Sequence, residues 1–300
     1  MFFLAHVKWF TESRDIQMSP IYHFDPTNPY VGFWVLIGLT LLFTAFILEK
    51  KLKGPSKKFL KKAEDSKGML LRIFQVLVGL SLLFASYRGA ILAPHYQGAS
   101  TSGFFQLLEY ITGALLIINF QTRIAATLLL IIYIGTIINF GFFEALDYIN
   151  LIGIAIFIFL SNKKEVALPI LRIFTGLALL ILAFSEKFLY PAKAYELVDK
   201  YHLNFMSVLG LDWFNHELFI FSAGVVEAVF GLIMIFGWIT RVNTTALLSF
   251  FVASNIYFFA IGYPEEAFIE LTGHLPLIGT AIILLTYGSG NLFKKKNAKT

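Results

Sequence analysis

The sequence predicts an all-α polytopic membrane protein of about nine transmembrane helices, with one N-terminal helix followed by two parallel four-helix-bundle repeats. Three observations predict this fold. Hydrophobic residues make up 57% of the 300 residues and charged residues only 14%, and the mean hydropathy is +0.73. Most apolar residues come in runs long enough to span a bilayer, and the chain repeats itself. Soluble domains carry nearer one quarter charged residues.

The apolar runs define the expected helices, and the fifth run is the shortest. They cover roughly residues 31–49, 69–90, 103–120, 124–142, 147–161, 167–189, 218–238, 242–262 and 272–288. These runs lack the alternating pattern of transmembrane strands, which are also shorter, so the sequence excludes a membrane barrel.

Residues 1–68 are expected to contain an outer N-terminal segment, the first transmembrane helix and a basic cytoplasmic linker. The apolar start of the chain lacks a long hydrophobic core and a small-residue cleavage site, so we predict no signal peptide. We expect residues 1–30 to lie at the outer membrane interface. Trp9, Tyr22 and Tyr30 would act there as aromatic belt residues.

The two repeats are expected at residues 69–163 and 164–300, and short motifs relate them. Leu-Arg-Ile-Phe at 71–74 recurs at 171–174, Glu109 recurs as Glu227, Thr-Arg at 122–123 recurs at 240–241, and Leu-Ile-Gly at 151–153 recurs at 277–279. Each unit has an even number of runs, so both copies should face the same way. We expect each to close as an antiparallel four-helix bundle.

The second copy carries a longer outer loop, at about residues 190–217. Its aromatic and charged residues fit either an amphipathic segment on the membrane surface or a docking surface for a redox or periplasmic partner protein.

The net charge of +5 is explained by its distribution and does not indicate a nucleic-acid partner. Under this topology, eighteen of the 24 basic residues fall on one side of the membrane. The positive-inside rule then places residues 50–68 and the C-terminus in the cytoplasm and the N-terminus outside. We therefore expect a multi-pass protein of a bacterial inner (cytoplasmic) membrane, with the lipid bilayer as its surroundings.

The chain has no cysteine. This excludes a disulfide framework, thiol–disulfide exchange and thiolate-held iron–sulfur clusters. All six histidines fall on the expected outer side, which argues against a haem held between two histidines inside the helices.

Glu109 and Glu227 are the first candidates for chemistry, in proton handling. Each lies about 10–15 Å into its apolar run at the helical rise, where a carboxylate is expensive and should face the protein interior. Arg123 and Arg241 follow 14 residues later, at the expected inner ends of the same helices, about 21 Å along the axis. A partner for Glu227 should therefore come from another helix. Alternatively, the glutamates only lock the helices together through hydrogen bonds.

A second set of candidates, for ligand binding, lies at the outer ends of the second copy. Glu186 and Lys187 end its first helix, and Glu270 and His274 are four residues apart, so they share a helix face. Two such ligands are too few to predict a metal site. The first copy has neither the Glu-Lys pair nor the histidine.

These motifs resemble the DoxX/DoxD group of bacterial membrane proteins. The resemblance covers about residues 168–288 and, more faintly, 69–161. It rests on Ser-Glu-Lys-Phe-Leu-Tyr-Pro at 185–191, Val-Glu-Ala at 226–228, Ile-Thr-Arg at 239–241 and His-Leu-Pro-Leu-Ile-Gly at 274–279. It implies a four-span unit, known in the membrane subunit of thiosulfate:quinone oxidoreductase.

The resemblance implies a subunit of a quinone- or sulfur-linked redox complex that binds a quinone or a small reduced substrate in the second bundle. Glu227 would accept a proton, Arg241 would anchor the ligand, and Glu270 with His274 would form an outer proton route. Two other hypotheses stay open. The chain could be a proton-coupled transporter or channel that uses Glu109 and Glu227, or a structural membrane anchor or assembly factor.

Overall fold

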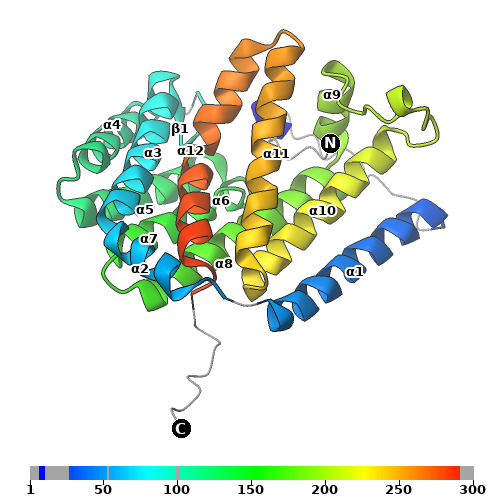
Figure 1. Cartoon of the computed structure of the whole chain (residues 1–300). Coiled ribbons are helices and arrows are strands. Elements are labelled where there is room, and N and C mark those ends of the chain that lie inside the picture. The colour runs from blue at the N-terminus through cyan, green and yellow to red at the C-terminus, as the bar shows by residue number, and fades with distance from the viewer. Residues whose placement is uncertain (1–6, 11–26, 53, 99–101, 291–300) are drawn as a thin grey trace.

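The computed structural model describes residues 7–10, 27–52, 54–98 and 102–290, and this part of the chain is predominantly helical (Figure 1). The α-helices are α1 (Pro29–Lys51), α2 (Lys57–Asp65), α3 (Lys67–Tyr87), α4 (Ser102–Ile118), α5 (Thr122–Phe140), α6 (Phe142–Leu146), α7 (Asn150–Phe159), α8 (Lys164–Leu182), α9 (Ala192–Lys200), α10 (His216–Phe236), α11 (Thr240–Ala260) and α12 (Pro264–Tyr287). Two short 3-10 helices are η1 (Val7–Trp9) and η3 (Ser207–Leu209), and a π-helix, η2 (Ala183–Leu189), extends α8. A small antiparallel sheet pairs β1 (Ala90–Ile91) with β2 (Ala93–Gln97).

Seven of the described helices are long and apolar enough to cross a membrane: α1, α3, α5, α8 with η2, α10, α11 and α12. The apolar parts of α4 and α7 are shorter. The chain is therefore a multi-pass membrane protein, as the sequence predicts, and the apolar runs at 103–120 and 147–161 give helices below spanning length.

Local sequence signals set several helix ends. Asn28 accepts a hydrogen bond from the backbone of Tyr30 and Pro29 occupies the first turn, so α1 begins there. Asn215 caps α10 in the same way, through the backbone nitrogen of Leu218 at 2.9 Å. That helix ends at Gly237, whose φ of +75° is a left-handed conformation that favours glycine.

Helix α1 packs along α10 and leaves most of its surface exposed (Figure 1). The contact requires a small residue, because a Cβ on Gly38 would lie 2.9 Å from the Val225 side chain. Large apolar side chains such as Leu36 and Phe43 point away from the protein. In a membrane, this surface faces lipid.

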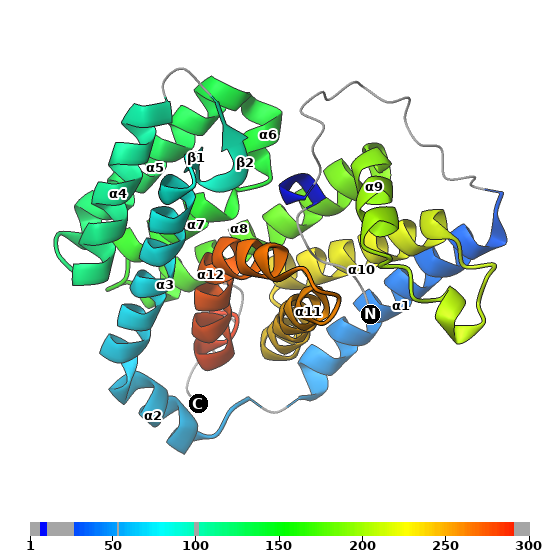
Figure 2. The same ribbon diagram turned by 90° about the horizontal axis from the view of Figure 1, so that it is seen from above.

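The fourth helix of each repeat packs against the first helix of the other repeat. Helix α12 lies against α3 and α11 and barely touches α8, whereas α7 lies against α5 and α8 (Figure 2). The expectation of two self-contained four-helix bundles is therefore wrong: the units 69–163 and 164–300 share their helices.

The repeated motifs form the contacts through which each repeat packs against the last helix of the other. Phe74, fully buried on α3, fits against Gly279 of α12, where an added Cβ would lie 2.9 Å from the ring. Phe174 on α8 fits against Gly153 of α7, where an added Cβ would lie 2.5 Å from the phenylalanine Cβ. Each phenylalanine thus occupies the glycine notch of the other copy.

Within each repeat, the first two helices pack through glycines. Gly79 and Gly113 let α3 and α4 approach backbone to backbone, and Gly176 and Gly231 do the same for α8 and α10. Such small-residue contacts are typical of helix pairs in lipid, where close van der Waals packing replaces the hydrophobic effect.

Residues 88–98, between α3 and α4, form a buried hairpin rather than an exposed loop. Ala90, Ile91 and Ala93 are fully buried, and Tyr96 donates a hydrogen bond to the backbone oxygen of Glu144. Non-helical backbone near membrane depth is tolerated where protein covers it, and here α3, α4 and the segment 142–149 do so.

The expected outer loop, 190–217, folds back over the helix ends. Leu197 and Val198 of α9 are buried, and the Tyr257 hydroxyl donates to the backbone oxygen of Tyr201 at 2.9 Å. Val208, at 85% exposure, stands out from this cap. Both an amphipathic cap and a docking surface remain compatible with this shape.

The N-terminal belt prediction is only partly right. Tyr30 is exposed and stacks on Trp213 at a ring distance of 4.5 Å, as a belt residue would. Tyr22 lies outside the described residues. Trp9 is wrong as a belt residue, because residues 7–10 insert between the two repeats and bury its ring.

Candidate functional site

A buried ion pair joins the two strongest sequence candidates of the second repeat. Lys187 Nζ on η2 lies 2.8 Å from Glu227 Oε2 on α10, and both side chains are almost completely buried. Lys187 also lies 3.5 Å from Glu186 Oε2. The expectation that Glu227 faces the interior and finds its partner on another helix agrees with this geometry.

The π-helix η2 brings these groups together. A wider turn replaces the regular helix at 183–189, so the neighbouring residues Glu186 and Lys187 are both buried. Such turns often occur at functional sites. Gly224 of α10 gives Lys187 and Phe188 room, because an added Cβ would lie 3.1 Å from Lys187 Cβ.

The network continues through the N-terminal segment into the first repeat. The backbone nitrogen of Val7 donates to Glu186 Oε2 at 3.3 Å. Lys8 Nζ lies 2.6 Å from Asp147 Oδ2 and 2.8 Å from Glu144 Oε2. Two residues near the start of the chain thus link carboxylates of both repeats.

Lys8 lies outside the spanning helices, and its pKa is raised well above the usual lysine value. Burial alone would lower this pKa, but the carboxylates of Asp147, Glu186 and Glu144 outweigh that effect. Lys8 is therefore a fixed cation at neutral pH. Ser185 donates to the other oxygen of Asp147 at 3.1 Å, which fixes that carboxylate as well.

This ionic network lies at the end of the molecule that the sequence predicts to be outer, and we call it the outer-end network. By formal charge it is acidic. Its members are Lys8, Lys187, Glu144, Asp147, Glu186 and Glu227. Its two lysines face four carboxylates in a largely desolvated space, where like charges raise the cost of full ionisation. Half-buried Lys193 also interacts with Glu144 and Glu186, so carboxylates still outnumber lysines. This excess of carboxylates favours binding of a proton or a further cation.

Glu270 and His274 lie next to this network on α12, both buried. Ser254 donates to Glu270 Oε1 at 2.7 Å. His274 Nδ1 lies 2.9 Å from the backbone oxygen of Glu270 and 3.9 Å from Oε1. The His274 ring stacks on Phe251 at 4.4 Å, and the Trp9 ring lies on it at 5.0 Å. Among the described residues, no three His, Cys, Asp or Glu side chains come together as metal ligands.

Glu109 has a different partner from Glu227. It is fully buried on α4, and its Oε1 accepts a hydrogen bond at 2.5 Å from the backbone nitrogen of Leu92. Leu92 links β1 to β2 with a positive φ of 60°. Glu109 therefore holds the buried hairpin, so the two repeated glutamates do not share one environment.

Arg241 lies at the opposite end of the molecule and is not part of the outer-end network. It starts α11 instead of ending the helix of Glu227, because the chain turns at Gly237. Its guanidinium donates to the backbone oxygens of Leu285 and Thr286, at the end of α12. Arg241 thus caps a helix, and the expectation that it ends the helix of Glu227 is wrong. A ligand-binding role of Arg241 stays a prediction.

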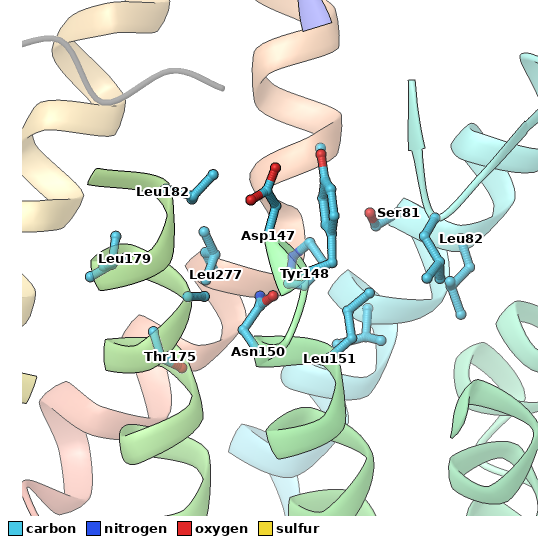
Figure 3. A pocket seen from close by; sticks show the side chains of 15 residues that line it. Ser81, Leu82, Asp147, Tyr148, Asn150, Leu151, Thr175, Leu179, Leu182 and Leu277 are labelled. Atoms are coloured by element: carbon cyan, nitrogen blue, oxygen red, sulfur yellow. The ribbon is translucent and has the colours of Figure 1, made fainter. Parts of the chain in front are cut away.

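Below the network lies a narrow central cavity, enclosed by α3, α7, α8 and α12, the four exchanged helices. Figure 3 shows Asp147, Tyr148 and Asn150 between leucines of α8 and α12 on one side and Ser81 of α3 on the other. The cavity volume is about 30 Å³. This is room for roughly one water molecule, and Asp147 joins the cavity to the ionic network.

Sequence reasoning missed Lys8 and Asp147. Asp147 begins an apolar run, so its depth could have marked it as a functional candidate. It has no counterpart in the second repeat, where Gly273 takes its place, and a search for repeated carboxylates passes over it. No local signal distinguishes Lys8.

Comparisons with protein-family models, curated proteins and solved structures give no match.

Proposed function

We propose that this chain is an integral membrane subunit of a redox complex, in which the outer-end network receives protons as a quinol or another small reduced substrate is oxidised. The observation that carries the proposal is the set of buried carboxylates and lysines from Glu227 to Asp147, which ends at a cavity between the repeats. The Val7 backbone and the Ser185 hydroxyl link its two halves. The resemblance of the second repeat to the DoxX/DoxD group suggests the quinone chemistry.

In the proposed reaction, a quinol loses two electrons and two protons and becomes a quinone. The electrons pass to a redox partner protein. Glu227, which is charged beside Lys187, accepts one of the two protons and becomes neutral, and the second proton leaves through Glu270 and His274 toward the outer surface. A ring-sized substrate requires an opened form of the cavity.

We also propose the finer topology. Helices α4 and α7 complete nine membrane segments, and α7, at about 15 Å, reaches through half of the hydrocarbon core. Basic groups gather at one end, where Lys164 pairs with Glu64 and the Tyr287 hydroxyl donates to the backbone of Ala63. By the positive-inside rule, this end is cytoplasmic in a bacterial inner membrane. A reporter active only in the cytoplasm should give a signal when fused to Thr300, and signal from Met1 alone would reverse the assignment.

The function is tested by quinol oxidation in lipid vesicles with an added artificial electron acceptor. Glu227→Gln keeps the shape of the side chain and removes the proton acceptor, so we expect oxidation to be lost while the folded protein persists. The matched control is Glu109→Gln, at the repeated position outside the network, which should keep the activity. Absence of both bound quinone and quinol oxidation in the wild-type protein would reject the proposal.

Proton-coupled transport is the second candidate, because Glu109, Glu227 and Glu270 are buried carboxylates on three different apolar helices. Proton movement across vesicles driven by a substrate gradient, without any electron acceptor, would favour it. If Glu227→Gln keeps both quinol oxidation and proton movement, the network has only a structural role and holds the helices together.

A further inference from the structure

The outer-end network holds an ammonium group in a shaped site. Lys8 Nζ contacts Asp147 at 2.6 Å and Glu144 at 2.8 Å, and Glu186 binds the backbone one residue earlier. The Lys8 side chain is only 13% exposed and the Asp147 side chain is fully buried. This is the geometry expected for a bound cation with several hydrogen-bond donors.

The segment that carries Lys8 lies across equivalent positions of the two repeats. Trp9 Nε1 donates to the Tyr148 hydroxyl at 2.5 Å and its ring lies 5.0 Å from His274, the residue that matches Tyr148 in the second copy. The same ring fills the space above Gly273, where an added Cβ would lie 2.2 Å from it. Residues 7–10, which have no repeated counterpart, thus lie where the corresponding segments around Tyr148 and His274 meet.

This segment also covers the central cavity. Lys8 and Trp9 contact Asp147, Tyr148 and Gly273, which all line that cavity. Next to them, the Phe10 ring packs against the rings of Tyr201 and Phe258. Figure 2 shows the segment, in dark blue, between α6 and α9, and it contacts α9 and β2.

We propose that Glu144 and Asp147, with the charge of Glu186 nearby, form a binding site for a primary ammonium group, which Lys8 fills in this structure, and that residues 7–10 are a plug displaced when an external ammonium compound takes the site. A primary ammonium presents three N–H donors on a compact charge, which suits two converging carboxylates. The plug competes at a high effective concentration because it belongs to the same chain. This inference concerns a ligand site and its cover, and it does not depend on the proposed redox function.

The first test is chemical rescue. Lys8→Ala removes the ammonium and leaves space, so butylammonium should raise the melting temperature of this variant more than that of the wild-type protein, in which it has to displace Lys8. Butanol and tetramethylammonium serve as controls for the apolar chain and for charge without N–H donors. Rescue should disappear when Asp147→Asn is added. Equal effects of butylammonium and butanol would overturn the ammonium site.

The second test retains Lys8 and measures the plug. The chain has no cysteine, so Ser81→Cys places one thiol on the cavity wall, and Ser207→Cys places a control thiol on the exposed outer loop. Loss of charged hydrogen bonds should open the cavity, so Lys8→Gln, or butylammonium on the Lys8 background, should speed labelling at position 81 by a polar thiol reagent about tenfold or more. The rate at position 207 should stay constant. An unchanged rate at 81 under both conditions would show that residues 7–10 do not cover an accessible site.

Discussion

Replacing Lys187 by methionine should destabilise the protein more than any single change to its carboxylate partners. Lys187 neutralises Glu227 at 2.8 Å and Glu186 at 3.5 Å, and all three groups are buried. Methionine fills a similar volume without charge, so the variant leaves two desolvated carboxylates facing each other. Removing one member of a buried ion pair costs about 3–5 kcal/mol of the free energy of unfolding.

The carboxylate variants provide the comparison. In Glu227→Gln, the amide oxygen still accepts from Lys187 and Glu186 still balances its charge, so we expect a cost of about 1 kcal/mol. In the double variant Lys187→Met with Glu227→Leu, an apolar pair replaces the ion pair, and such replacements are often neutral or stabilising. The double variant should therefore recover most of the stability that Lys187→Met loses.

Reversible unfolding in mixed detergent micelles, followed by circular dichroism, measures these differences. The expected order of stability is wild type, then Glu227→Gln, then Lys187→Met, with the double variant above Lys187→Met. If Lys187→Met is as stable as the wild type, or if the double variant is less stable than Lys187→Met, the ion pair does not hold α10 to η2 and the reasoning fails.

Two further predictions concern the helix packing. Because Phe74 fits against Gly279, Phe74→Cys with Gly279→Cys should form an oxidative cross-link in this cysteine-free chain, which is seen as a gel shift. The control, Phe174→Cys with Gly279→Cys, is the pair expected in self-contained bundles and should not cross-link. The reverse result would support separate bundles. A Cβ on Gly176 would lie 2.6 Å from a backbone oxygen of α10, so Gly176→Val should cost about 1–3 kcal/mol through overpacking, while Gly32→Val, with open space around it, should cost less than Gly176→Val in the same unfolding assay.

The membrane character of the chain is visible in its sequence because hydropathy reports which surface a helix must bury. Hydropathy does not predict which neighbouring helix covers that surface. The motifs at 71–74 and 277–279 were found as repeats, but periodicity does not say whether Phe74 packs on Gly153 of its own unit or on Gly279 of the other. Both pairings bury the same side chains, so only the three-dimensional arrangement separates them.

The candidate site was predictable to the extent that its members interrupt apolar runs. Glu227 and Glu270 are carboxylates among apolar residues, and such residues rarely face lipid, so their burial follows from sequence. Arg241 lies far from Glu227, as the spacing predicts, but on a different helix, because Gly237 ends the helix of Glu227. Lys8 was missed because its charge is balanced by residues more than 130 positions away.

The asymmetry between the two copies accounts for where the ionic network forms. At the end of the first helix, the first copy has Ser86 and Tyr87 where the second has Glu186 and Lys187. Tyr87 is 81% exposed and reaches away from the protein, whereas Lys187 is buried against Glu227. Glu109 consequently has no lysine at the equivalent place and binds a backbone nitrogen of the hairpin instead. Duplication thus supplied two similar carboxylates, and a lysine in only one copy connects its carboxylate to a second buried one, Glu186.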